Sequence, residues 1–159
     1  MELLERRTRV GSLVSAGLGI LFGQVLIMGG SLITWQSDPV LGIYTRTGLD
    51  YHNLVSGDGK ITLVLGIVGF ISLVLGAIFV RKIFFAIPTA CAVFLFFFSM
   101  GELILLFTRN GVIAPGHGLY TIFGGTVAAF FCSLGGYLMT SERDEKIRLA
   151  SRAVANAEA

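Results

Sequence analysis

Glu102 is the acidic residue that falls inside a long apolar run of this chain. A carboxyl group in that setting can hold a proton, bind a cation or form a buried hydrogen bond, and intramembrane ionisable groups are functional candidates by default. Gln24, in an earlier apolar run, carries an amide that can donate to this carboxyl. Glu102 and Gln24 therefore form the candidate intramembrane polar site.

The remaining side chains that could do chemistry form no motif. His52 and His117 lie in polar segments without the spacing of metal ligands. Cys91 and Cys132 lie in apolar runs without a C-x-x-C pattern, where small packing residues are expected. The sequence thus predicts no catalytic residue, no cofactor-binding residue and no metal site, and we do not expect an enzyme.

The elements that position these residues are membrane spans. The 159 residues are 54% hydrophobic and 14% charged, whereas a soluble domain carries about 25% charged residues. Apolar runs long enough to cross ~30 Å of hydrocarbon cover residues 11–34, 61–80, 83–107 and 119–139. They lack period-2 polarity, so they are predicted helices. The predicted fold class is an all-α membrane protein with a four-transmembrane-helix bundle, an N-terminal segment 1–10 and a helical tail 140–159.

Basic residues predict the orientation of the bundle. Nine flank the ends of the spans on one side and three on the other. The nine are Arg6, Arg7, Arg9, Arg81, Lys82, Arg143, Lys146, Arg148 and Arg152, against Arg46, Lys60 and Arg109. Cytoplasmic loops carry the excess of positive charge, so both termini are predicted to be cytoplasmic in a multi-pass protein of the cell membrane. The first apolar run exceeds the length of a typical signal peptide, and we expect it to remain as a span. The net charge of +2 is too small to indicate a nucleic-acid partner.

Small residues recur in the first span at four-residue spacing. The stripe of Gly11, Ser15, Gly19 and Gly23 lets another helix backbone approach closely, which favours association in lipid. It predicts either packing within the bundle, which we favour, or contact with a partner protein or a second copy. The third span is bulky instead, and we expect its phenylalanines to fill gaps left by glycine. The residues that make this span bulky are Phe94, Phe96, Phe97 and Phe98.

The longest polar segment, residues 35–60, joins the first two spans. Residues 42–47 are β-branched and aromatic between turn signals, which predicts a short β-hairpin over the outer mouth of the bundle. Loops carry specific contacts more often than the elements they connect. The candidate outer-loop interaction residues are Trp35, Tyr44, Arg46 and Tyr51.

The sequence around Gly57-Asp58-Gly59-Lys60, after a first span that ends in Trp35, resembles small uncharacterised four-helix membrane proteins of bacteria and archaea. The resemblance covers about the first half of the chain and implies the fold alone. The layout is also similar to that of claudin-like proteins, although the paired loop cysteines and the Gly-Leu-Trp motif of claudins are missing from this sequence.

We expect a non-catalytic accessory or structural membrane protein that acts through helix–helix or outer-loop contacts. Its expected partners are the lipid bilayer and either another membrane protein or further copies of itself. The alternative is a minimal transporter or channel that uses Glu102 and Gln24, although transport usually needs more polar groups than these two. A lipid-binding protein or membrane enzyme would need a lateral groove with convergent polar groups, for which the sequence has few polar residues.

Overall fold

The computed structural model describes residues 2–37, 45–47, 58–108 and 114–157. Within these ranges, four helices are long and apolar enough to cross a membrane. They are Glu5–Leu32, Gly59–Phe79, Lys82–Thr108 and His117–Ala153. Each overlaps one of the predicted spans, so the prediction of four apolar helices is confirmed.

The first of these helices is built from three consecutive segments. α1 (Glu2–Leu18) and α2 (Val25–Leu32) are α-helical, and the π-helical segment η1 (Gly19–Gln24) joins them. Leu18, at φ −64° and ψ −42°, keeps right-handed helical backbone at the junction. The axis therefore continues from α1 into α2 without a break.

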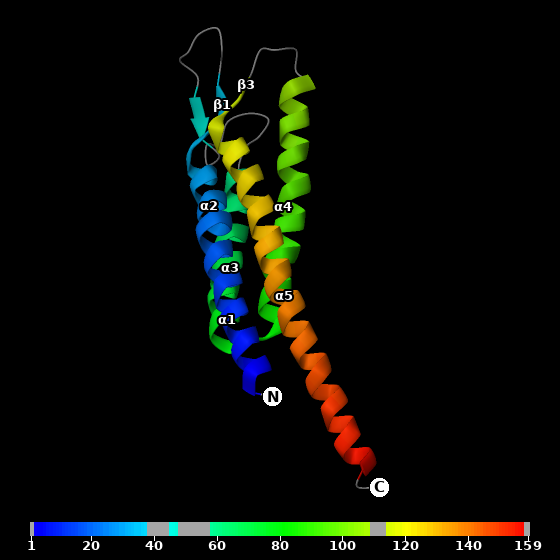
Figure 1. Cartoon of the computed structure of the whole chain (residues 1–159). Helices are drawn as coiled ribbons and strands as arrows, with labels where there is room; N and C mark the ends of the chain where they lie inside the picture. The colour runs from blue at the N-terminus through cyan, green and yellow to red at the C-terminus, as the bar shows by residue number, and fades with distance from the viewer. Residues whose placement is uncertain (1, 38–44, 48–57, 109–113, 158–159) are drawn as a thin grey trace.

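The other helices are α3 (Asp58–Phe79), α4 (Lys82–Thr108) and α5 (His117–Ala157). Both termini lie at one end of the bundle, here called the terminus end, and short strands lie at the opposite end, here called the strand end (Figure 1). α5 runs past the other helices at the terminus end (Figure 1). The predicted tail therefore continues the fourth span as one helix to Ala157.

Three short strands lie at the strand end, in the order β2-β1-β3. β1 (Thr34–Ser37) pairs antiparallel with β2 (Thr45–Thr47) and with β3 (Ala114–Pro115). The sheet thus joins the connection after the first span to the connection before the fourth. The first half of the predicted hairpin segment, residues 42–44, lies outside the described residues, and its last three residues form β2.

Large apolar side chains on the outside of the bundle are widely exposed. Leu21 is 62% exposed, Ile78 61%, Phe97 69% and Phe131 66%. A monomer in water rarely leaves so much contiguous apolar surface uncovered. This distribution suits hydrocarbon surroundings and agrees with the apolar character of the four helices.

The four-residue stripe of the first helix faces α5. A Cβ atom placed on Gly23 would lie 2.7 Å from the Ala129 Cβ, and one placed on Gly19 would lie 3.3 Å from the Cys132 Cβ. A Cβ on Gly11 would overlap the sulfur of Met139. Ser15 completes the contact, because its hydroxyl lies 3.6 Å from where a Gly135 Cβ would stand. The stripe is therefore filled by a helix of the same chain.

The π-helical segment helps to keep this stripe on one face. In an α-helix of 3.6 residues per turn, positions four apart drift by about 40° per step. The wider π turn rotates less per residue, so positions four apart inside it drift in the opposite sense. Gly19 and Gly23 both lie in η1, where this reversal keeps Gly23 directed at α5 and Gly19 directed between α5 and Leu73 of α3, whose Cδ1 would lie 3.0 Å from an added Cβ.

The contact between the first helix and α5 is closest toward the strand end. A Cβ on Gly30 would lie 2.8 Å from the Gly118 carbonyl oxygen, and one on Gly125 would lie 3.0 Å from the Gly23 carbonyl oxygen. Backbone thus approaches backbone at these positions. Any larger side chain would have to push the two helices apart.

One phenylalanine of α4 does fill a space left by glycine, but it is Phe85. Its ring is fully buried and lies between Gly76 of α3 and Gly136 of α5. The expectation that a phenylalanine of the third span fills such a space therefore holds for Phe85, whereas Phe94 and Phe97 of the bulky run are 53% and 69% exposed. The sequence pattern did not distinguish the inward face of α4, because aromatic residues lie on both faces.

The turn between α3 and α4 consists of Val80 and Arg81. Val80 adopts φ 50°, a left-handed backbone that is strained for a β-branched residue. Its N–H donates to the Gly76 carbonyl at 2.9 Å, and the Ser72 hydroxyl donates to the Phe84 carbonyl at 2.8 Å. The first bond extends the end of α3 by one residue, and the second links α3 to α4 at the terminus end.

Gly23 provides a direct test of the stripe, with Gly17 as a matched control in the same continuous helix. A Cβ on Gly17 meets nothing within 4 Å, whereas one on Gly23 meets Ala129 backbone at 2.8 Å. We expect Gly23→Ala to destabilise the protein by about 1–3 kcal/mol through overpacking. Gly17→Ala should stabilise the protein by about 0.5–1 kcal/mol, because alanine loses less backbone entropy than glycine in a helix. Unfolding of the purified protein in detergent, followed by circular dichroism, measures both, and equal effects would refute this packing.

Candidate functional site

Trp35 ties the strands to the helices at the strand end. Its side chain is 1% exposed, and its indole N–H donates to the Gly30 carbonyl at 2.8 Å. Its own carbonyl accepts a 2.7 Å hydrogen bond from the Gly116 N–H. One residue of β1 is thus bonded both to α2 and to the segment that leads into α5.

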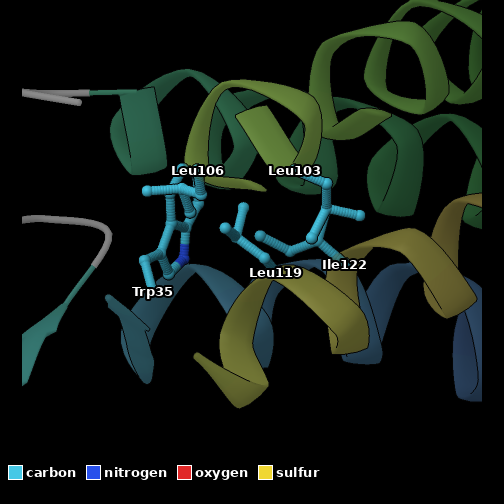
Figure 2. Packing of buried hydrophobic residues seen from close by; sticks show 5 residues of the cluster. All are labelled: Trp35, Leu103, Leu106, Leu119 and Ile122. Atoms are coloured by element: carbon cyan, nitrogen blue, oxygen red, sulfur yellow. The ribbon is translucent and has the colours of Figure 1, made fainter. Parts of the chain in front are cut away.

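The Trp35 ring packs into an apolar cluster with residues of α4 and α5. The side chains of Leu103, Leu106, Leu119 and Ile122 form this cluster with the ring (Figure 2). Leu119 and Ile122 are fully buried. The cluster therefore closes the strand end of the bundle beneath the sheet.

Glycine at the start of α5 allows this closure. A Cβ on Gly118 would lie 2.6 Å from the Gly30 carbonyl oxygen and 2.8 Å from Cδ1 of Trp35. A Cβ on Gly116 would overlap the Thr34 carbonyl oxygen. Larger residues at either position would separate the sheet from the helices.

Glu102 lies on α4 next to this cluster. It is 8% exposed, so its carboxyl belongs to the interior of the bundle and not to the surrounding lipid. It precedes Leu103, which packs in the cluster with Ile122 of α5. The structure therefore places Glu102 near the strand end, as its position in the span suggested.

Gln24 lies deeper in the bundle, at the last position of η1, and is 1% exposed. Its amide covers Gly69 of α3, where an added Cβ would lie 2.7 Å from the amide nitrogen and oxygen. π-helical segments are frequent at functional sites. Here the π-helical segment places the Gln24 amide against Gly69 of α3, where α3 has no side chain.

Gln24 and Glu102 are attached at different depths. Gly23, beside Gln24, contacts Ala129, whereas Leu103, beside Glu102, packs with Ile122. Seven residues of α5 separate Ala129 from Ile122, which corresponds to about 10 Å along the axis. The structure therefore does not set the two residues of the predicted polar site side by side.

Hydroxyl groups form a polar contact between the first two membrane helices that sequence reasoning missed. The hydroxyl oxygens of Ser31 and Thr62 lie 2.6 Å apart. Ser31 also bonds to the Ile27 carbonyl at 2.8 Å, and Thr62 to the Gly59 carbonyl at 2.9 Å. Both residues are buried and lie within two turns of the strand end of their helices. This shared depth was the feature of the sequence that could have predicted the contact.

The predicted outer-loop residues have different outcomes. The prediction that the Trp35 side chain contacts an outside partner is wrong, because its ring is buried inside the bundle. Arg46 lies on β2, opposite Gln36 of β1. Tyr44 and Tyr51 fall outside the described residues. The Trp35 expectation failed because an indole at a span end can anchor at an interface or seal a bundle, and the sequence does not separate these roles.

Trp35→Phe tests the seal at the strand end. The variant keeps an aromatic ring but removes the donor to the Gly30 carbonyl, which leaves a buried acceptor unsatisfied. We expect a loss of about 1–3 kcal/mol in unfolding free energy and faster hydrogen exchange near Gly30 and Gly116. Tyr120→Phe, at a ring that is 49% exposed, is the control and should be close to neutral. An unchanged exchange pattern in Trp35→Phe would contradict the anchoring role.

Comparison of the chain with protein-family models, with curated proteins and with solved structures finds no match. The resemblance noted in the sequence therefore gains no residue-by-residue support from a relative. The function has to be argued from the contacts of this chain itself.

Proposed function

We propose that this protein is a non-catalytic accessory or structural membrane protein that engages another membrane protein through its strand end. The observation that carries this is the Trp35 anchor, which fixes β1 to α2 and to the start of α5. A short sheet held in this way offers a defined surface to a partner. Conformational order already present before binding reduces the entropic cost of association.

The packing of the glycine stripe supports the same choice of surface. The helix–helix mode of partner contact needs an open groove of small residues, and the stripe from Gly11 to Gly23 is filled by α5. We therefore assign partner binding to the strand end and not to the glycine stripe. The segment around Arg46, where the hairpin is predicted, belongs to this surface in the proposal.

The proposed location is the cell membrane, with both termini in the cytoplasm. The nine basic residues assigned to the terminus end, against three at the strand end, support this orientation. The strand end then faces the outside of the cell. A partner would be either a membrane protein with an extracytoplasmic segment or a second copy of this chain.

Transport remains the second candidate function, and the burial of Glu102 favours it. An ionisable side chain at 8% exposure inside an apolar bundle is a common element of proton and cation pathways. The difference in depth between Glu102 and Gln24 means that a route would have to use both residues in succession along the axis. This requirement makes the accessory role the simpler proposal.

Site-specific photo-crosslinking in native membranes tests the proposal. Photoreactive residues replace Tyr120 and Phe107, which are 49% and 66% exposed near the strand end. Phe79 and Ile83, 56% and 58% exposed near the terminus end, are the matched controls. We expect one reproducible partner at the strand-end positions and none at the controls, identified by mass spectrometry.

Equal labelling at both ends, or no protein product at either, would contradict the accessory role. Transport would then be the better proposal. Its test compares Glu102→Gln with the parent protein in an ion-flux assay with reconstituted vesicles. A product that contains two copies of this chain would support the strand end as an interface and name the partner as the protein itself.

A further inference from the structure

An apolar groove of about 350 Å³ opens on the outside of the bundle between α4 and α5. Its lining is apolar apart from Thr126, whose hydroxyl donates to the Phe123 carbonyl at 2.7 Å. Its walls include Ala92, Val93, Phe96 and Phe97 of α4, with Phe130 and Phe131 of α5. Phe97 and Phe131 are 69% and 66% exposed at its mouth, so the groove faces the surrounding hydrocarbon.

A polar pocket lies between the same two helices at the terminus end. Lys82 opens α4 on one side, and Ser141, Asp144, Glu145 and Arg148 of α5 form the other. Arg143 already pairs with Asp144 at 3.2 Å. The pocket therefore combines two basic side chains with Ser141 and two carboxylates, one of which is paired with Arg143.

The groove and the pocket lie on one line along both helices. Val93 is 11 residues after Lys82, about three α-helical turns, and Arg148 is 18 residues after Phe130, which is five turns. Each pair therefore occupies one face of its helix. Between Lys82 and Val93 the same face of α4 carries Thr89, whose hydroxyl donates to the buried Ser133 hydroxyl of α5 at 2.9 Å, so an acyl chain that joins the pocket to the groove lies on the outside of this bridge.

The spacing along this line matches the dimensions of one bilayer leaflet. Ala92 is 10 residues from Lys82, and Phe131 is 10 residues from Ser141, so the groove begins about 15 Å from the pocket on both helices. A leaflet has about 15 Å of hydrocarbon and roughly 6 Å of headgroup layer. A lipid whose headgroup lies in the pocket would therefore extend the distal part of an acyl chain into the groove.

We propose that the seam between α4 and α5 is a binding site for one zwitterionic phospholipid of the leaflet at the terminus end. Lys82 and Arg148 bind the phosphate, because charge-assisted hydrogen bonds to phosphate are strong. Glu145 accepts from the headgroup ammonium. A pocket of mixed charge suits a headgroup that carries both signs, and an anionic headgroup would meet the carboxylates unfavourably. This inference does not depend on the proposed partner at the strand end.

Native mass spectrometry of the full-length protein, released from detergent after incubation with defined lipids, tests the site. The probe is long-chain phosphatidylethanolamine, compared with phosphatidylglycerol of the same chains and with a short-chain phosphatidylethanolamine. We expect one retained long-chain phosphatidylethanolamine per protein. Lys82→Ala and Arg148→Ala should each weaken its binding by about tenfold. Arg81→Ala and Arg152→Ala, at exposed neighbouring basic residues, are the controls and should bind as the parent does.

A second pair of variants tests the groove without changing charge. Val93→Trp places a large ring in the groove, whereas Val64→Trp places it on α3, at a position that is 57% exposed. Only Val93→Trp should reduce retention of the long-chain lipid, and it should leave short-chain binding unchanged. Preference for phosphatidylglycerol, equal losses in the control variants, or retention that is indifferent to Val93→Trp would each overturn the proposal.

Discussion

The close approach of the first membrane helix to α5 is the contact on which the rest of the structure depends. In hydrocarbon, apolar side chains gain little by leaving the solvent, so helix association relies on van der Waals contact between surfaces that fit closely. Glycine provides such surfaces at Gly23 against Ala129 and at Gly30 against Gly118. The hydroxyl pair Ser31–Thr62 then holds α3 against the first helix, and Phe85 fills the space between α3 and α5.

The strand end follows from the same approach. Because the backbones of α2 and α5 nearly touch at Gly30 and Gly118, the indole of Trp35 can reach the Gly30 carbonyl while its backbone bonds to Gly116. The short sheet is therefore positioned by helix packing. The sheet is therefore the proposed interaction surface, because the face of the first helix that carries the glycine stripe is already covered by α5.

The sequence was sufficient to predict the helical fold but not its finer contacts. Long apolar runs identified the four helices, since lipid requires internal backbone hydrogen bonding. It could not show the π-helical turn at Gly19–Gln24, because hydrogen-bond register depends on how α5 packs. The same lack of tertiary information placed Trp35 on an outer surface and did not show which phenylalanine of the third span faces inward. The alignment of Lys82 and Arg148 with the apolar groove likewise depends on which helices are neighbours.

Disulfide formation between position 19 and the native Cys132 tests the central contact most directly. The Cβ of a residue at position 19 would lie 3.3 Å from the Cys132 Cβ, so a shift of a few tenths of an ångström brings the pair into the range of about 3.5–4.5 Å found in disulfides. Gly19→Cys is oxidised in native membranes in a Cys91→Ser background, with Gly17→Cys as the control on an open face. The account predicts a disulfide within one chain for Gly19→Cys and none for Gly17→Cys, shown by peptide mass spectrometry and a monomeric band on a non-reducing gel. A disulfide-linked dimer, or no disulfide, would show that the stripe does not pack against α5 of its own chain.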